Sequence, residues 1–157
     1  MLDKPRAFEV AAILSVSVLI HCPPAWAVLG GSPGVMEADG HPSTGQISTT
    51  PAPQYTVQEL TTSDLVVKEY VSSEGMVFAV SWAGRRPPKL TILLGTYFEE
   101  YEAASADAAS RRSPVRGVTH VETPHLAVDS GGHMGAIWGK AYVPALFPPG
   151  VTKEAIQ

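Results

Sequence analysis

The sequence predicts an α+β protein in which an antiparallel sheet of about five strands, in the order β-β-β-α-β-β, is packed by one amphipathic helix. Three observations lead to this fold class. Positions 64–84 hold the densest run of β-branched and aromatic residues, a helical stripe follows, and a second strand-like run comes near the end. Helix and strands are segregated along the chain, which is typical of α+β proteins.

The first part of the chain has the layout of a secretory signal peptide. Lys4 and Arg6 precede the apolar stretch Val10–Ile20, and Ala25-Trp26-Ala27 is typical of a cleavage site. We therefore expect residues 1–27 to be removed and the mature protein to be periplasmic or secreted, with no transmembrane segment. An uncleaved anchor is the alternative interpretation.

Charge and cysteine content limit the classes of function. The net charge is −4, and it stays at −4 when residues 1–27 are removed, because that segment holds two acidic and two basic residues. A mildly acidic chain gives no reason to expect nucleic acid as a partner. Cys22 is the only cysteine and lies in the predicted signal peptide, so we expect the mature chain to fold without a disulfide.

Composition divides the remainder into three parts. Residues 28–54 are rich in Gly, Pro, Ser and Thr, which predicts a flexible leader, although its few apolar residues leave docking on the domain open. Residues 55–150 form the single α+β domain. Pro144 and Pro148-Pro149-Gly150 are expected to end the ordered chain, so residues 151–157 are a tail.

The central prediction is a β-hairpin over Asp64–Gly84, preceded by a strand at Tyr55–Leu60. A four-residue loop, Ser72–Gly75, pairs Val71 with Met76 and Val67 with Val80. One face then carries Leu65, Val67, Val71, Met76, Phe78, Val80 and Trp82, with Glu69 as its only charge. A three-residue loop with a glycine bulge shifts the pairing by one and places Lys68 among the large side chains. We favour the first register because it segregates the side chains better.

The helix prediction comes from a stripe of apolar residues at steps of three and four. The stripe consists of Leu90, Leu93, Leu94, Tyr97, Phe98 and Tyr101. We expect one helix continuing to about Ala104, because the stripe keeps its phase across Gly95. A helix that ends at Leu94, with an extended chain from Thr96, is the alternative.

Two further segments complete the predicted sheet. Val118–Glu122 is a predicted strand, and His125–Ser130 and His133–Val143 form a second hairpin across the turn Gly131-Gly132. In that register Asp129 faces Met134 and His125 faces Trp138.

The C-terminal segment Ser130–Gly150, SGGHMGAIWGKAYVPALFPPG, resembles the closing signature of an uncharacterised family of small exported proteobacterial proteins. Leu29-Gly30-Gly31, Val66–Trp82 and Leu93–Phe98 fit the same pattern, so the resemblance covers nearly all of the mature chain. The family is a domain of unknown function (number 2844 of that series). The resemblance implies an exported bacterial protein and supplies no catalytic residues.

No catalytic, cofactor-binding or metal-binding residue is predicted. After cleavage there is no thiol, and the chain has no nucleophile elbow or S-x-x-K arrangement. His125, Asp129 and His133 cannot converge in the predicted hairpin, because His133 points to the other face. His120, Glu122 and His125 could approach one another at Pro124, without a fourth ligand or a characteristic metal spacing.

Seven residues remain as candidates for a functional surface. Glu69 is an acid on an apolar face, and Arg85 and Arg86 form a basic corner before the helix that suits an anion or a solvated loop. Trp138 beside two glycines suits a groove or the core. The complete set is Glu69, Arg85, Arg86, His125, His133, Trp138 and Tyr142.

The sequence favours a non-enzymatic binding or interaction module of the bacterial envelope, whose partner is an envelope protein or polymer. Two alternatives remain. One is a small envelope hydrolase that works from His120, His125 or Glu69, and the other is a structural accessory of a surface assembly.

Overall fold

The computed structural model describes residues 29–33, 45–111 and 118–157, so the predicted signal peptide lies outside the described residues. These residues form a seven-stranded antiparallel sheet with the spatial order β1-β2-β3-β4-β7-β6-β5. The strands are β1 (Gln46–Pro51), β2 (Tyr55–Thr61), β3 (Leu65–Ser72), β4 (Val77–Gly84), β5 (Val118–Glu122), β6 (Ala127–His133) and β7 (Ala136–Tyr142). The α+β class is as predicted, and the sheet has seven strands rather than about five.

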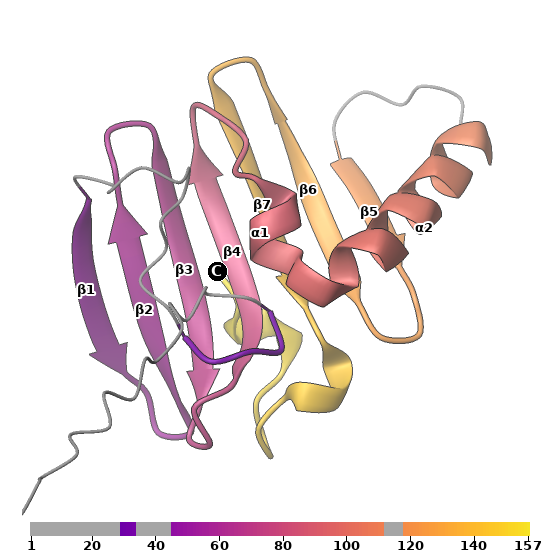
Figure 1. Cartoon of the computed structure of the whole chain (residues 1–157). Helices are drawn as coiled ribbons and strands as arrows, with labels where there is room; N and C mark the ends of the chain where they lie inside the picture. The colour runs from indigo at the N-terminus through magenta and orange to yellow at the C-terminus, as the bar shows by residue number, and fades with distance from the viewer. Residues whose placement is uncertain (1–28, 34–44, 112–117) are drawn as a thin grey trace, which may run out of the picture.

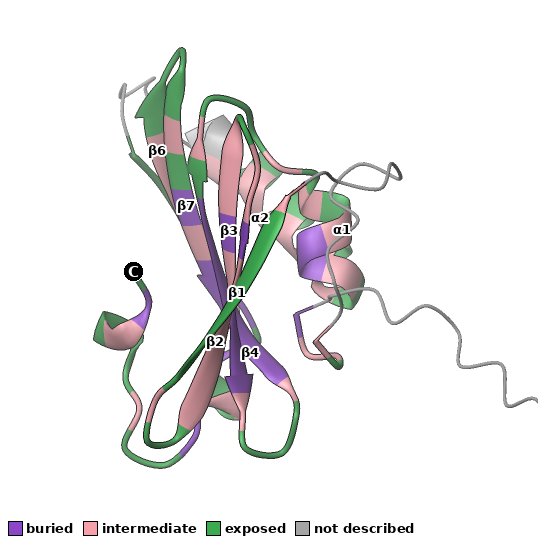
Figure 2. Cartoon of the chain, turned by 90° about the vertical axis from the view of Figure 1, so that its left-hand side faces the viewer, coloured by how far each residue is buried: buried purple, intermediate pink, exposed green. Residues whose placement is uncertain are grey.

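Two antiparallel meanders are joined in the middle of the sheet, where β4 pairs with β7 (Figure 1). The connection between the meanders runs through α1 (Leu90–Leu94), a 3₁₀ turn η1 (Gly95–Tyr97) and α2 (Phe98–Arg111). These helices all lie on one face of the sheet, here called the helix face. The end of the chain lies on the opposite face, the tail face (Figure 2).

The extra strand β1 corrects the expectation that residues 28–54 form only a flexible leader. Gln46–Pro51 pairs with β2 along its whole length, and all six of its residues are exposed. Both faces of this edge strand are solvated, so its polar residues show no alternation with apolar ones. Backbone hydrogen bonds to β2 therefore hold this strand in the sheet, although its side-chain pattern does not predict a strand.

The register of the β3–β4 hairpin differs from both predicted registers along most of its length. Val71 pairs with Val77 near the turn, as the three-residue loop requires, and the pairing then shifts so that Glu69 faces Val80 and Val67 faces Trp82. The shift makes Phe78 an extra residue in β4, which is a β-bulge.

The bulge changes which face two of the predicted residues occupy. Phe78 packs on the tail face with Tyr70, and Val77 replaces it on the helix face. Met76, also predicted on the helix face, lies just outside β4. Leu65, Val67, Val71, Val80 and Trp82 lie in the helix-face core as predicted, and Lys68 points to the other face.

Gly95 interrupts the predicted helix without ending it. Its φ of 52° lies in the left-handed region that glycine adopts readily. The chain makes one 3₁₀ turn there and continues as α2 to Arg111, beyond the predicted end near Ala104. The alternative of an extended chain after Thr96 is therefore wrong, and the single continuous helix is two helices.

The helix face is covered by the predicted stripe. Leu93 and Leu94 are buried, and Leu90, Tyr97, Phe98 and Tyr101 pack against the same core as partly buried residues. Leu29 joins this core with 1% of its surface exposed, and its amide donates to the carbonyl of Leu93. The leader therefore docks on the domain at residues 29–31, where Gly30 and Gly31 exchange backbone hydrogen bonds with Val77.

The tail face carries a second core, and the end of the chain covers it. Ile156 is buried against Tyr70, Phe78, Ala79 and Tyr142. The backbone of Gln157 both accepts a hydrogen bond from the Tyr70 hydroxyl, at 2.7 Å, and donates one to it, at 2.8 Å. Residues 151–157 are therefore packed against the sheet, and the ordered chain does not end at Gly150 as expected.

Candidate binding site

The hairpin β6–β7 turns at Met134-Gly135, three residues after the predicted turn. Gly135 has a φ of 83°, the conformation that the second position of a tight turn requires. Gly131 and Gly132 stay inside β6. A Cβ at Gly132 would collide with the carbonyl oxygen of Ala136, so this strand position also requires glycine.

The corrected turn changes the cross-strand neighbours of the predicted site residues. Asp129 faces Lys140 rather than Met134, and Gly131 faces Trp138. His125 lies before β6 and is not part of the hairpin. The hairpin tip is also longer than predicted, and the Met134 side chain at its end is fully exposed.

A groove of about 580 Å³ lies between this hairpin and the loop that joins β4 to α1; it is called the hairpin groove below. Its walls are mainly apolar, and among the described residues its only ionisable side chains are Arg85 and His133. The loop is tied to the sheet because the amide of Arg85 donates to the carbonyl of Asp64 at 2.7 Å. The main apolar lining residues are Trp82, Pro87, Pro88, Leu90, Ile137 and Trp138.

Trp82 reaches the groove from β4 because its cross-strand partner is a glycine. Gly139 faces Trp82, and a Cβ at Gly139 would collide with the indole ring. The ring therefore lies directly over the backbone of β7. Gly139 thus allows a close approach of a side chain, as expected for a glycine inside a strand.

Trp138 also borders a second groove, of about 340 Å³, on the tail face; this is called the sheet groove. Its main lining side chains come from neighbouring positions on three strands and from the end of the chain. They are Val66, Lys68, Ser81, Ala83, Trp138, Lys140 and Ile156. The exposed fraction of Trp138 is 42%, so this indole is available to solvent between the two grooves.

Glu69 lies on the helix face as predicted, and only 3% of its surface is exposed. Neither carboxyl oxygen has a hydrogen-bond partner among the described residues. Burial raises the pKa of Glu69 to about 8, so the group is mostly protonated at pH 7. Glu69 borders neither of the two grooves, which separates it from the candidate site.

The histidines of the β5–β6 region make local ion pairs. His120 Nδ1 lies 2.5 Å from Asp129 Oδ1, and Nε2 lies 3.3 Å from Glu122 Oε2. The hydrogen bond to Asp129, more than the one to Glu122, raises the pKa of His120. The predicted approach of His120 to Glu122 is therefore present, but His125 is not part of this group.

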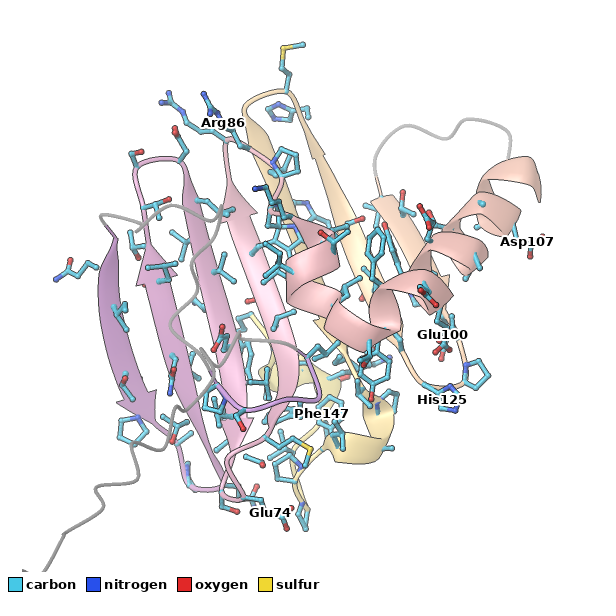
Figure 3. The ribbon with its side chains drawn as sticks, viewed as in Figure 1. Glu74, Arg86, Glu100, Asp107, His125 and Phe147 are labelled. Atoms are coloured by element: carbon cyan, nitrogen blue, oxygen red, sulfur yellow. The ribbon has the colours of Figure 1, made fainter. Side chains whose placement is uncertain are left out.

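His125 instead pairs with α2. Its Nδ1 lies 3.3 Å from Glu100 Oε2, and Figure 3 shows the two side chains together, far from Arg86. The hydrogen bond from Thr123, followed by the charge of His125, holds the pKa of Glu100 below its usual range. Among the described residues, no group of three or more His, Cys, Asp or Glu side chains could hold a metal ion.

The structure thus brings together three of the seven predicted site residues: Arg85, His133 and Trp138 line the hairpin groove. Arg86 is an exposed neighbour in the loop and does not line it. Tyr142 packs edge-on against Phe147 in the tail-face core, where burial raises the pKa of its hydroxyl.

Sequence reasoning missed Met134, Lys68 and Lys140. The full exposure of Met134 results from the observed position of the turn. The two lysines lie on either side of β4 because the strands that carry them, β3 and β7, both pair with β4. The alternation of strand residues would have placed each lysine on a face, but the strand order was needed to place them together.

The described residues contain no helix long and apolar enough to cross a membrane.

The model of a family described as "Protein of unknown function (DUF2844)" matches residues 25–156, which is most of the sequence. The chain belongs to this family. Comparison with curated proteins and with solved structures gave no match. Membership of the DUF2844 family agrees with the resemblance of the C-terminal signature and assigns no reaction to the site.

Proposed function

We propose that this DUF2844 protein is an exported, non-enzymatic binding module of the bacterial envelope, and that the hairpin groove is its contact surface. The observation that carries the proposal is the shared groove of Arg85, His133 and Trp138. A concave, mainly apolar site with a few polar groups is the usual form of a binding pocket in proteins. The signal-peptide layout of residues 1–27 supports export.

The composition of the groove favours binding over catalysis. Within the part of the chain that the structure describes, the imidazole of His133 has one hydrogen-bond partner, the carbonyl of Met134 at 3.2 Å, and no carboxylate there orients it as a base. The three residues from which a hydrolase was predicted to work, Glu69, His120 and His125, all lie outside the groove. A hydrolase that used any of these three residues would need a substrate site other than the two grooves.

Crosslinking in intact cells tests the proposal. The photoreactive residue benzoylphenylalanine is placed at Met134, at the hairpin tip, and in a matched control at Ile47, which is exposed on the far edge strand. We expect an envelope component to be crosslinked from position 134 and not from position 47, and the adduct to be lost with Trp138→Ala or Arg85→Gln.

Two results would contradict the binding function. One is the same adduct from both positions, independent of Trp138 and Arg85. The other is turnover of a generic ester or glycan substrate by the purified protein, lost on His125→Ala, because that would favour the hydrolase.

A further inference from the structure

The tail face of the sheet carries a row of charged and polar residues that crosses all seven strands. The pairing registers align Ser48, Glu59, Lys68, Ser81, Lys140, Asp129 and His120, one from each strand. Lys68 and Lys140 flank Ser81 within this row. Their Cα atoms are about 10 Å apart, because two inter-strand spacings separate them.

The acidic neighbours of the two lysines are already engaged. Asp129 pairs with His120 at 2.5 Å, on the side away from Lys140. Glu59 lies 3.8 Å from Lys68 and also accepts a hydrogen bond from Thr61. A half-buried ion pair at that distance, open to solvent on one side, holds a lysine only weakly.

Lys140 has no direct ion pair or hydrogen bond within the described part of the chain. Its charge acts at a distance on Glu154, whose pKa is lowered mainly by the hydrogen bond from Thr152 and only slightly by Lys140. Both ammonium groups are therefore available to a ligand.

The sheet groove concentrates positive charge in a protein whose net charge is −4. Lys68 and Lys140 are the only charged side chains that line it among the described residues. Ser81 lies between them, but its hydroxyl already donates to the carbonyl of Gln157 at 2.8 Å. Gln157 also lines the groove, and its side chain is polar but uncharged. Both charged side chains of the groove are thus cationic, which favours an anionic occupant.

One wall of the groove is apolar. Val66, Ala83 and Trp138 are consecutive cross-strand neighbours on β3, β4 and β7, and Gly131 and Val118 continue the line towards the edge. Trp138 and Val118 have exposed fractions of 42% and 58%. An exposed indole beside small residues offers a face on which a ring with an apolar side can pack.

We propose that the sheet groove binds an acidic sugar chain, whose ring packs on Trp138 and whose carboxylates pair with Lys68 and Lys140. A sugar acid combines a flat apolar ring face with a negative group, as the groove combines an indole with two ammonium groups. The apolar line also crosses the strands, whereas an extended peptide recognised by main-chain pairing would run along a sheet edge. This inference rests on the proposed binding function and supplies the ligand class.

Calorimetric titration of the purified protein tests the inference. The probes are tetramers of galacturonate, mannuronate and glucuronate, with the methyl ester of each as its neutral match. We expect at least one acid to bind, about tenfold or more tighter than its ester, and added salt to weaken the binding. Lys68→Gln with Lys140→Gln should weaken it about tenfold, as should Trp138→Ala.

Arg86→Gln is the matched control, because it removes an exposed positive charge that lines neither groove. This variant should bind within about twofold of the parent protein. Equal melting temperatures would show that the lysine and tryptophan variants remain folded.

The inference is wrong if none of the three acids binds, if the esters bind equally well, or if the lysine pair has no effect. Tighter binding of a tetraglutamate peptide or of anionic lipid vesicles would assign the groove to another class of partner and would also overturn it. Crosslinking from position 134 probes the other groove. A positive crosslink without sugar binding would therefore leave the proposed function standing.

Discussion

At the residue scale, the buried carboxyl of Glu69 is the group with the clearest consequence for stability. It lies opposite Gln58 on one side and Val80 on the other, and neither oxygen has a hydrogen-bond partner in the described chain. Ionising a buried carboxyl group that has no partner costs a large free energy, so Glu69 keeps its proton instead. This side chain reduces the stability of the fold at neutral pH without taking part in either groove.

The raised pKa of Glu69 predicts how stability depends on pH. Between the ordinary value of 4.5 and about 8, the folded chain holds a proton that the unfolded chain has released. The free energy of unfolding should therefore fall as pH rises through this window, by up to about 1.4 kcal/mol per pH unit from this group. Glu69→Gln should remove that component and be more stable than the parent protein at pH 8.

Urea unfolding at pH 4, 6 and 8 measures the effect, with Glu102→Gln on the exposed flank of α2 as the control. The parent protein and Glu102→Gln should show the same pH dependence. If Glu69→Gln also follows the parent curve at all three values, Glu69 is ionised in the folded protein and the proposed protonation is wrong.

At the element scale, the sequence predicted best those elements whose side-chain pattern repeats. All six residues of the predicted helical stripe pack on the helix-face core, because burial of one helix side imposes a spacing of three and four. The strands β2, β3, β4 and β5 were predicted at nearly their observed bounds. Their β-branched and aromatic residues favour strands wherever one or both faces are buried.

The wrong predictions concern elements whose register or turn position is set by backbone contacts. The bulge at Phe78 lets a large aromatic residue reach the tail face, which no alternation rule anticipates. In β6–β7, Gly131-Gly132 and Gly135 all permit a turn, and the pairing of His133 with Ala136 selects the second. Of the site residues, Arg85, His133 and Trp138 were found by residue type, but the groove that joins them depends on the observed hairpin length.

The docking of residues 151–157 gives a prediction about Tyr70. Its hydroxyl makes two hydrogen bonds with the backbone of Gln157, and Ile156 beside it is buried. Tyr70→Phe should lower the free energy of unfolding by about 1–2 kcal/mol, because both hydrogen bonds are lost and the Gln157 amide loses its partner. It should also speed proteolysis near Ile156, because the segment is held less firmly.

Tyr55→Phe is the matched control, since Tyr55 packs against Tyr70 and Phe78 in the same aromatic cluster. Its hydroxyl makes no hydrogen bond within the described residues, so the loss should stay within about 0.5 kcal/mol. Equal losses in the two variants would mean that the hydrogen bonds to Gln157 do not hold the segment.

At the scale of the whole molecule, the two faces of the sheet are covered unequally. The helices and Leu29 cover the helix face from its central strands to the β5 edge, whereas the chain end covers only part of the tail face. The strand ends near Trp138 are left open on both sides, and both grooves lie there. The distribution of covering segments thus explains why the candidate site is at this end of the sheet.

Export without a disulfide is the prediction for residues 1–157 as a whole. The single cysteine, Cys22, precedes the predicted cleavage after Ala27, so the mature protein would contain no thiol. Its stability would then come from the two apolar cores on either side of the sheet, and reductants should leave its melting temperature unchanged. The mass of protein recovered from the periplasm or medium should correspond to a chain that begins at Val28.

Recovery of the uncleaved chain in the membrane fraction would contradict export by cleavage and favour the anchored alternative. In that case residues 1–27 would act as an uncleaved anchor, and Cys22 would remain in the protein.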